Sequence, residues 1–172
     1  MALSLYDLCV PSYLQILGAT EGFLAKAKQH FADNKVDPNE VVEAKLAPDM
    51  LPFRFQIVAV AHHSAGAIKG VKAGAFGPPS PSTADYAGLQ KLVSEARETL
   101  EKAKPDEVNS CEGKDVIFSV GDRKLPFTAE GFLQSFSLPN FYFHATTAYD
   151  ILRSKGVPLG KRDFLGKMRM KG

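Results

Sequence analysis

The chain has 172 residues and lacks several features that would indicate a particular compartment or partner. It has no tryptophan, and its only two cysteines, Cys9 and Cys111, are far apart. This usage excludes a disulfide-rich scaffold and fits a reducing compartment. The sequence has no run of 18 apolar residues and no charged-then-apolar leader. We therefore expect a soluble, cytoplasmic protein that does not span a membrane.

A strong charge of one sign is also missing. The net charge is +2, so bulk electrostatics does not favour binding to nucleic acid or to a membrane surface. The basic excess lies in residues 161–172, where five Lys and Arg residues accompany a single acidic residue, Asp163. A short basic tail of this kind is typical of a solvated terminus. Nucleic acid is therefore not the expected partner.

Nucleotide-binding and metalloprotease motifs are absent as well. The sequence contains no GxGxxG, no GxxxxGK[ST] and no HExxH. Ser64 directly follows His63, but neighbours on a helix point about 100° apart, which is poor geometry for a nucleophile and its base. With 45% hydrophobic and 23% charged residues, the composition suits one domain, residues 1–172, with a sizeable core.

Hydrophobic periodicity predicts four long helices, over about 4–31, 53–75, 83–104 and 129–155. Pro11 should kink the first helix or mark its true start. Residues 32–39 form a turn-rich connection, with a short helix expected at 40–45. Residues 77–83, GPPSPST, are a rigid linker in which Ser82 or Thr83 would cap the next helix.

A change of period indicates a β-hairpin over about 115–127. Val116, Phe118 and Val120 recur at every second position, and Gly121-Asp122 is a turn. Thr128 would cap the last helix. The sequence therefore predicts a mainly α protein: an antiparallel up-down four-helix bundle with a small hairpin before its last helix.

The segment 133–152 carries polar residues on its core-facing side: Ser137, Asn140, His144 and Thr147. Asn140 and His144 are four residues apart, so their side chains lie one above the other on a helix. Both side chains could therefore contact the same ligand. Taken alone, the stripe favours an internally hydrogen-bonded helix with a satisfied core histidine.

The helix over 53–75 offers a second histidine at a helix–helix groove. His63 shares a flank with Gln56 and lies beside small residues, whereas His62 is expected on the solvated outer side. Sites in bundles are built from facing helices, so His63 and His144 are the candidate pair. Zinc or nickel needs at least three good ligands. Two histidines and the Asn140 amide would need Asp7, a tyrosine or waters to complete the set.

Three segments together resemble a known family: HSAGA at 63–67, the opening SLYDLCVPSYLQILG, and the block from Gly121 to Phe164 that contains LPNFYFHATTAYDILR. The chain resembles a numbered family of unknown function within the DinB/YfiT-like superfamily. The resemblance implies a four-helix bundle, a homodimer and often a divalent metal held by three histidines. His63 matches the histidine of the second helix, and His144 the last of the fourth. Asn140 stands where the remaining histidine would be.

Two main hypotheses follow. In the first, a small molecule binds between the second and fourth helices, where His63 and His144 act as acid/base residues or metal ligands and Asn140 orients the ligand. The resemblance then implies transferase, isomerase or hydrolase chemistry. Zinc or nickel is the possible cofactor, but the incomplete ligand set favours no tightly bound metal. In the second, the polar residues form a structural network in a non-catalytic homodimeric bundle.

Overall fold

A capping box starts the longest helix of the computed structural model, which describes residues 3–171. The Ser4 side chain accepts a hydrogen bond from the Asp7 amide, and the Asp7 carboxylate accepts one from the Ser4 amide. Helix α1 runs from Leu5 to Asp33 and passes through Pro11. Pro11 therefore does not mark the start of the helix.

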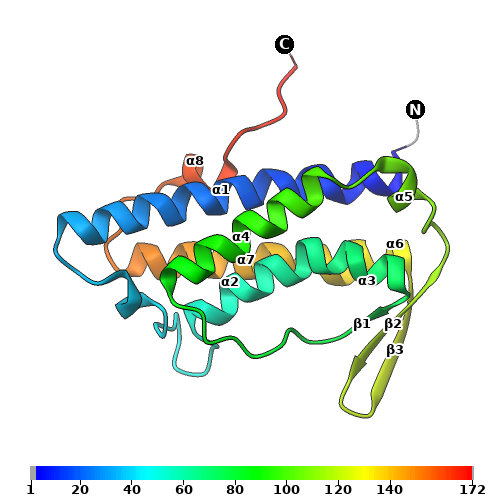
Figure 1. Ribbon diagram of the computed structural model, residues 1–172, viewed down its shortest axis with the longest axis horizontal. Helices are drawn as coiled ribbons and strands as arrows, with labels where there is room; N and C mark the ends of the chain where they lie inside the picture. Colours follow the sequence, from blue (N-terminus) through cyan, green and yellow to red (C-terminus); the bar gives the residue numbers. More distant parts are fainter. Residues whose placement is uncertain (1–2, 172) are drawn as a thin grey trace.

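Three further long helical units match the predicted ones to within a few residues (Figure 1). The second consists of α2 (Phe53–Ala61), a π-helical turn η2 (His62–Gly66) and α3 (Ala67–Ala73). The third is α4 (Tyr86–Glu101), which is capped by Asp85 and not by Ser82 or Thr83. The fourth consists of α6 (Ala129–Gly131), a π-helical segment η3 (Phe132–Ser137) and α7 (Leu138–Ser154). The short elements are η1 (Pro38–Val41, 3₁₀, in place of the helix expected at 40–45), α5 (Pro105–Asn109) and α8 (Lys161–Leu165).

The predicted hairpin is present and belongs to a three-stranded sheet. Strands β2 (Asp115–Val120) and β3 (Arg123–Thr128) are antiparallel, and Gly121 adopts a positive φ of 55° at their turn. Strand β1 (Ala75–Phe76) pairs with β2 in parallel and was not predicted. Thr128 caps α6 as expected, since its side chain accepts a hydrogen bond from the Gly131 amide at 3.1 Å.

The predicted up-down order of the helices is wrong in one respect: α2 and α4 run in the same direction (Figure 1). Phe53 and Tyr86, the first residues of these helices, stack with ring centroids 6.2 Å apart. At the other end, Lys72 in α3, which continues α2, forms an ion pair with Glu107 in α5, which follows α4. The two helices therefore start at the same end of the molecule and run in parallel. Between them the chain has to run back over the length of the α2–α3 unit.

The segment 76–85 makes this return. Ten extended residues can span roughly 30 Å, and the helical unit from 53 to 73 is about as long. Its prolines, Pro78, Pro79 and Pro81, favour extended backbone. The linker predicted at 77–83 is therefore part of this extended, proline-rich segment. We call residues 76–85 the strap, and it runs alongside the α2–α3 unit from β1 to the start of α4 (Figure 1).

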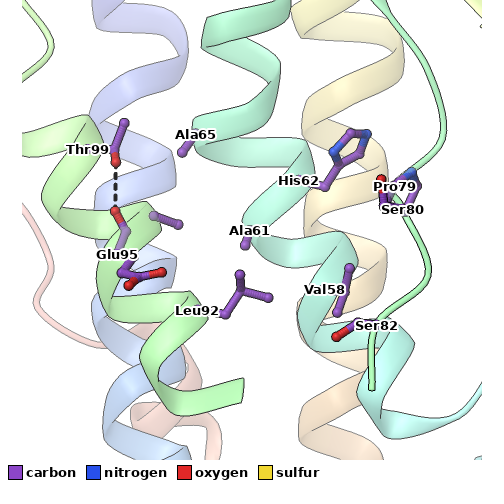
Figure 2. Close-up of a pocket in the computed structure, with 11 residues that line it drawn as sticks. Val58, Ala61, His62, Ala65, Pro79, Ser80, Ser82, Leu92, Glu95 and Thr99 are labelled. Atoms are coloured by element: carbon purple, nitrogen blue, oxygen red, sulfur yellow. Dashed lines mark hydrogen bonds between the residues drawn. The ribbon is translucent and has the colours of Figure 1, made fainter. Parts of the chain in front are cut away.

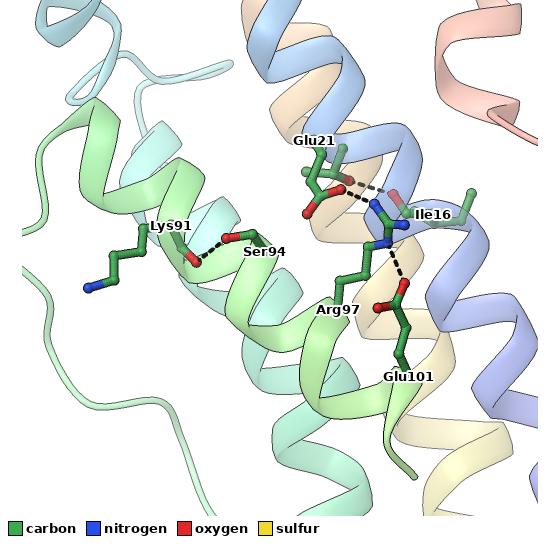
Figure 3. Close-up of polar contacts among 7 residues, drawn as sticks. Ile16, Glu21, Lys91, Ser94, Arg97 and Glu101 are labelled. Atoms are coloured by element: carbon green, nitrogen blue, oxygen red, sulfur yellow. Dashed lines mark hydrogen bonds and ion pairs between the residues drawn. The ribbon is translucent and has the colours of Figure 1, made fainter.

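The interface between α1 and α4 is apolar inside and ion-paired at its edge. The Tyr86 hydroxyl donates to the Leu24 carbonyl at 2.9 Å. Nearer the surface, the Arg97 guanidinium lies between the carboxylates of Glu21 and Glu101 (Figure 3). Within residues 3–171, no helix combines the length and the apolar character needed to cross a membrane.

Candidate functional site

Both helices that carry candidate residues widen into π-helical turns next to one another. His63 lies in η2, and Ser137 ends η3. The Ser137 hydroxyl donates to the His63 carbonyl at 2.8 Å and accepts a hydrogen bond from the Tyr13 hydroxyl at 3.1 Å. This buried network satisfies a carbonyl of the widened turn. Single π-helical turns occur frequently at functional sites.

The structure brings His63 and His144 together, as the sequence predicted. Their rings are nearly parallel, at 17°, with centroids 5.9 Å apart. The His63 ring also lies 5.5 Å from the Phe76 ring and 5.6 Å from the Phe136 ring. His63 is only 7% exposed, and its Nδ1 is buried without a hydrogen-bond partner among the described residues. Because an unpaired buried polar atom costs about 1–3 kcal/mol, this nitrogen requires an explanation.

His144 is held on one side by a residue that the sequence reasoning did not single out. Its Nδ1 lies 2.8 Å from Oε1 of Gln56, and Nε2 of Gln56 donates to the Leu51 carbonyl at 2.8 Å. The rings of Phe55 and Phe143 meet the imidazole edge to face. Gln56 shares a flank of its helix with His63, which was the only available signal.

Burial keeps both imidazoles neutral. Desolvation, together with the smaller effects of the neighbouring His62 and His144, lowers the pKa of His63 to about 3. Desolvation alone lowers the pKa of His144 to about 4. At neutral pH both rings therefore offer a lone pair, and neither serves as a cationic acid.

The hydrogen bond that the Asn140 amide group donates goes to the backbone and not to a histidine. Its Nδ2 donates to the Phe136 carbonyl of its own helix at 2.7 Å. Thr147 likewise donates to the Phe143 carbonyl at 2.8 Å. These two polar residues of the predicted stripe are thus satisfied within the helix.

The donor set near the histidines does not suit zinc or nickel. Across residues 3–171, no three His, Cys, Asp or Glu side chains come together as metal ligands. Asp7, the acidic residue considered as a further ligand, is engaged in the cap of α1. Two imidazoles provide fewer donors than such an ion requires.

The prediction that His62 is solvated on the outer side is wrong. His62 is half-buried, its Nε2 lies 2.7 Å from the Gly77 carbonyl oxygen, and its ring stacks on Phe76 with centroids 4.3 Å apart. The strap, which periodicity could not place, covers it. His62 contributes to a cavity of about 390 Å³ between α2, η2, α4 and the strap (Figure 2). The cavity lining is mainly apolar and includes neither His63 nor His144: Val58, Ala61, His62, Ala65, Pro79, Ser80, Ser82, Leu92, Glu95, Ala96 and Thr99.

Comparison with known proteins agrees with the resemblance seen in the sequence. A family model described as "Domain of unknown function (DUF1993)" matches residues 5–165. The crystal structure of a DinB family member protein from Shewanella denitrificans, at 1.83 Å resolution, superimposes with a TM-score of 0.79. The two sequences are 26% identical, and the match covers 98% of this chain and 95% of the other. No curated protein matches the sequence.

Proposed function

The chain belongs to the DUF1993 family of domains of unknown function, and we propose that its His63–His144 pair binds a small neutral molecule by accepting hydrogen bonds from it. One observation carries the proposal. His63 Nδ1 is buried and unpaired at the point where the two imidazoles stack. A polar group that only packs would be expected to find a partner within the fold. A ligand N–H or O–H would supply it.

The chemistry follows from the neutral rings. A neutral imidazole accepts a hydrogen bond from a hydroxyl, thiol or amide of a ligand, and the lowered pKa of both rings means that this group keeps its proton. Phe55, Phe76 and Phe136 surround the pair and disfavour a charged ligand, because burying an unpaired charge is costly. We therefore infer that the ligand is neutral and has an apolar or aromatic body.

We further infer that this site operates without zinc or nickel, because no three His, Cys, Asp or Glu side chains of residues 3–171 are placed to hold a metal ion. The third nearby imidazole, that of His62, has its Nε2 against the Gly77 carbonyl. Elemental analysis of the purified protein, with a thermal shift on added zinc, nickel and manganese, tests this inference. About one metal per chain together with stabilisation by that metal would contradict it.

A thermal-shift screen of neutral phenols, thiols and amides tests the ligand class. A compound that binds the native state raises the melting temperature by mass action. We expect the stabilisation to be lost in His144→Leu and in His63→Leu, and kept in the control His30→Gln, since His30 lies in the last turn of α1. Compounds that stabilise both site variants as strongly as the wild type would contradict the proposal.

A non-catalytic bundle is the second candidate, and a specific observation favours it. Ser137, Asn140 and Thr147 all donate to backbone carbonyls, as residues of a structural network do. In this alternative the four helical units form a DinB-like bundle that assembles as a homodimer, as the resemblance implies. The two candidates differ at His63, since a structural network would lose stability when that residue is replaced.

A further inference from the structure

We infer that Gln56 is a positioning residue that holds His144 in the tautomer with the proton on Nδ1, so that Nε2 is the nitrogen presented to a ligand. Gln56 is 2% exposed and bridges the start of α2 to α7. This inference deepens the proposed function. It rests on that function only for the use made of the Nε2 lone pair, since the tautomer exists without any ligand.

The orientation of the Gln56 amide follows from the Leu51 carbonyl. A backbone carbonyl oxygen only accepts hydrogen bonds, so the amide atom that faces it at 2.8 Å must be the NH₂ group. The opposite orientation would place two oxygens against each other. The Gln56 carbonyl oxygen is therefore directed at His144, and a rotation of the amide would lose the hydrogen bond to Leu51.

The tautomer of His144 follows in turn. The Gln56 oxygen has no hydrogen to give, so the 2.8 Å contact is a hydrogen bond only if His144 Nδ1 carries the proton. A neutral imidazole with its proton on Nδ1 has its lone pair on Nε2. The hydrogen bond made by one ring nitrogen commonly fixes the role of the other in this way.

The surrounding rings fix the orientation of the imidazole as well as its tautomer. His63 stacks on one face of the ring, and Phe55 and Phe143 meet it edge to face. Rotating the ring by half a turn about its Cβ–Cγ bond would put Cδ2 in the place of Nδ1, so the hydrogen bond to the Gln56 oxygen would be lost. Gln56 thus determines which nitrogen of His144 accepts a hydrogen bond from a ligand, while contacting no ligand itself.

Two variants of Gln56 separate this positioning role from a purely structural one. Gln56→Met and Gln56→Glu both lose the hydrogen bond donated to Leu51, and they have side chains of similar length. At neutral pH only the glutamate variant keeps an oxygen that accepts from His144 Nδ1. The exposed Gln134→Met serves as the control for the substitution itself.

The readout is the ¹⁵N chemical shift of the two ring nitrogens of His144 in uniformly labelled protein, assigned by the loss of signals in His144→Leu. We expect a protonated Nδ1 in the wild type, in Gln134→Met and in Gln56→Glu. In Gln56→Met we expect a shift towards the tautomer with the proton on Nε2. A wild-type His144 with its proton on Nε2, or a Gln56→Met variant that keeps the wild-type tautomer, would overturn the inference.

The result does not depend on the proposed function. If Gln56 fixes the tautomer but the ligand screen finds no compound that requires His144, the proposed function fails and the positioning role stands. If the screen succeeds and the tautomer is unchanged in Gln56→Met, this inference alone fails.

Discussion

The α1–α4 interface and the α2–α7 interface differ in whether their polar groups have hydrogen-bond or ion-pair partners. At the interface of α1 and α4, Tyr86 reaches the Leu24 carbonyl, and Arg97 pairs with Glu21 and Glu101 near the surface (Figure 3). At the interface of α2 and α7, two π-helical segments meet, and His63 Nδ1 remains buried and unpaired. The polar groups described at the first interface all have partners, whereas the second interface holds a buried nitrogen without one.

This difference separates polar residues that hold the fold from those available for chemistry. Ser137, Asn140 and Thr147 lie on the same helical stripe as His144, yet each is satisfied by a carbonyl. Spacing on a helix cannot distinguish these cases. The hydrogen-bond partners can, and they reduce the predicted polar stripe to a pair of histidines with Gln56.

The largest predicted effect is on the pH dependence of stability. The folded-state pKa values of His63 and His144, about 3 and about 4, lie below the usual value of 6.5, so below pH 6.5 the unfolded chain binds more protons. Stability from these groups is therefore complete above pH 6.5 and lost as the pH falls towards 4. The free energy of unfolding should fall by up to about 1.4 kcal/mol per pH unit for each histidine.

Urea unfolding of wild type and of the double variant His63→Leu/His144→Leu between pH 4.5 and 7.5 measures this effect. The double variant should lose most of the slope between pH 6.5 and 4.5, because carboxylates titrate mainly below that range. Equal slopes in the two proteins would contradict the assignment of neutral, buried imidazoles.

The next effect concerns the Ser137 hydroxyl, which links Tyr13 of α1 to the His63 carbonyl of η2. Ser137→Ala leaves the His63 carbonyl and the Tyr13 hydroxyl without their partner, so it should destabilise the protein by about 1–3 kcal/mol. Ser94→Ala is the matched control, because Ser94 donates to the Lys91 carbonyl on the exposed side of α4 (Figure 3). The control should change stability by less than about 0.5 kcal/mol. Equal losses in the two variants would remove the contrast between the interfaces.

The smallest effect is expected at the ion pairs of Arg97, which is 42% exposed. Arg97→Met should cost about 0.2–1 kcal/mol at low salt, because exposed ion pairs gain little and are screened. In 1 M salt the difference from wild type should vanish. A loss of several kcal/mol in the free energy of unfolding that persists in high salt would contradict this expectation. It would mean that the ion pairs of Arg97 contribute as much to stability as the buried network of Ser137.

Helix positions could be predicted from the sequence because each long helix has its own apolar period. The direction of α4 could not, because a period is the same for a helix running either way. Only the length and proline content of the segment 76–85 carried that information, and the interpretation of residues 77–83 as a rigid linker assigns them no path. Strand β1 has two residues, which is too short to show an alternation.

Part of the candidate site was visible in the sequence. The helical period of the two segments placed His63 and His144 on facing helices, and their rings do lie against each other. The covered position of His62 depends on the strap, and the role of Gln56 depends on the Leu51 carbonyl five residues earlier. Contacts of this kind arise between elements, so no pattern within one helix reports them.

The free energy of unfolding of His63→Leu, measured by urea denaturation at pH 7, tests the central claim most directly. If His63 is kept for a ligand and not for the fold, replacing its unpaired nitrogen with an apolar side chain of similar size should leave stability unchanged or raise it by up to about 1 kcal/mol. A loss of about 2 kcal/mol or more in a folded variant would show that His63 is part of the structural network and would contradict the account.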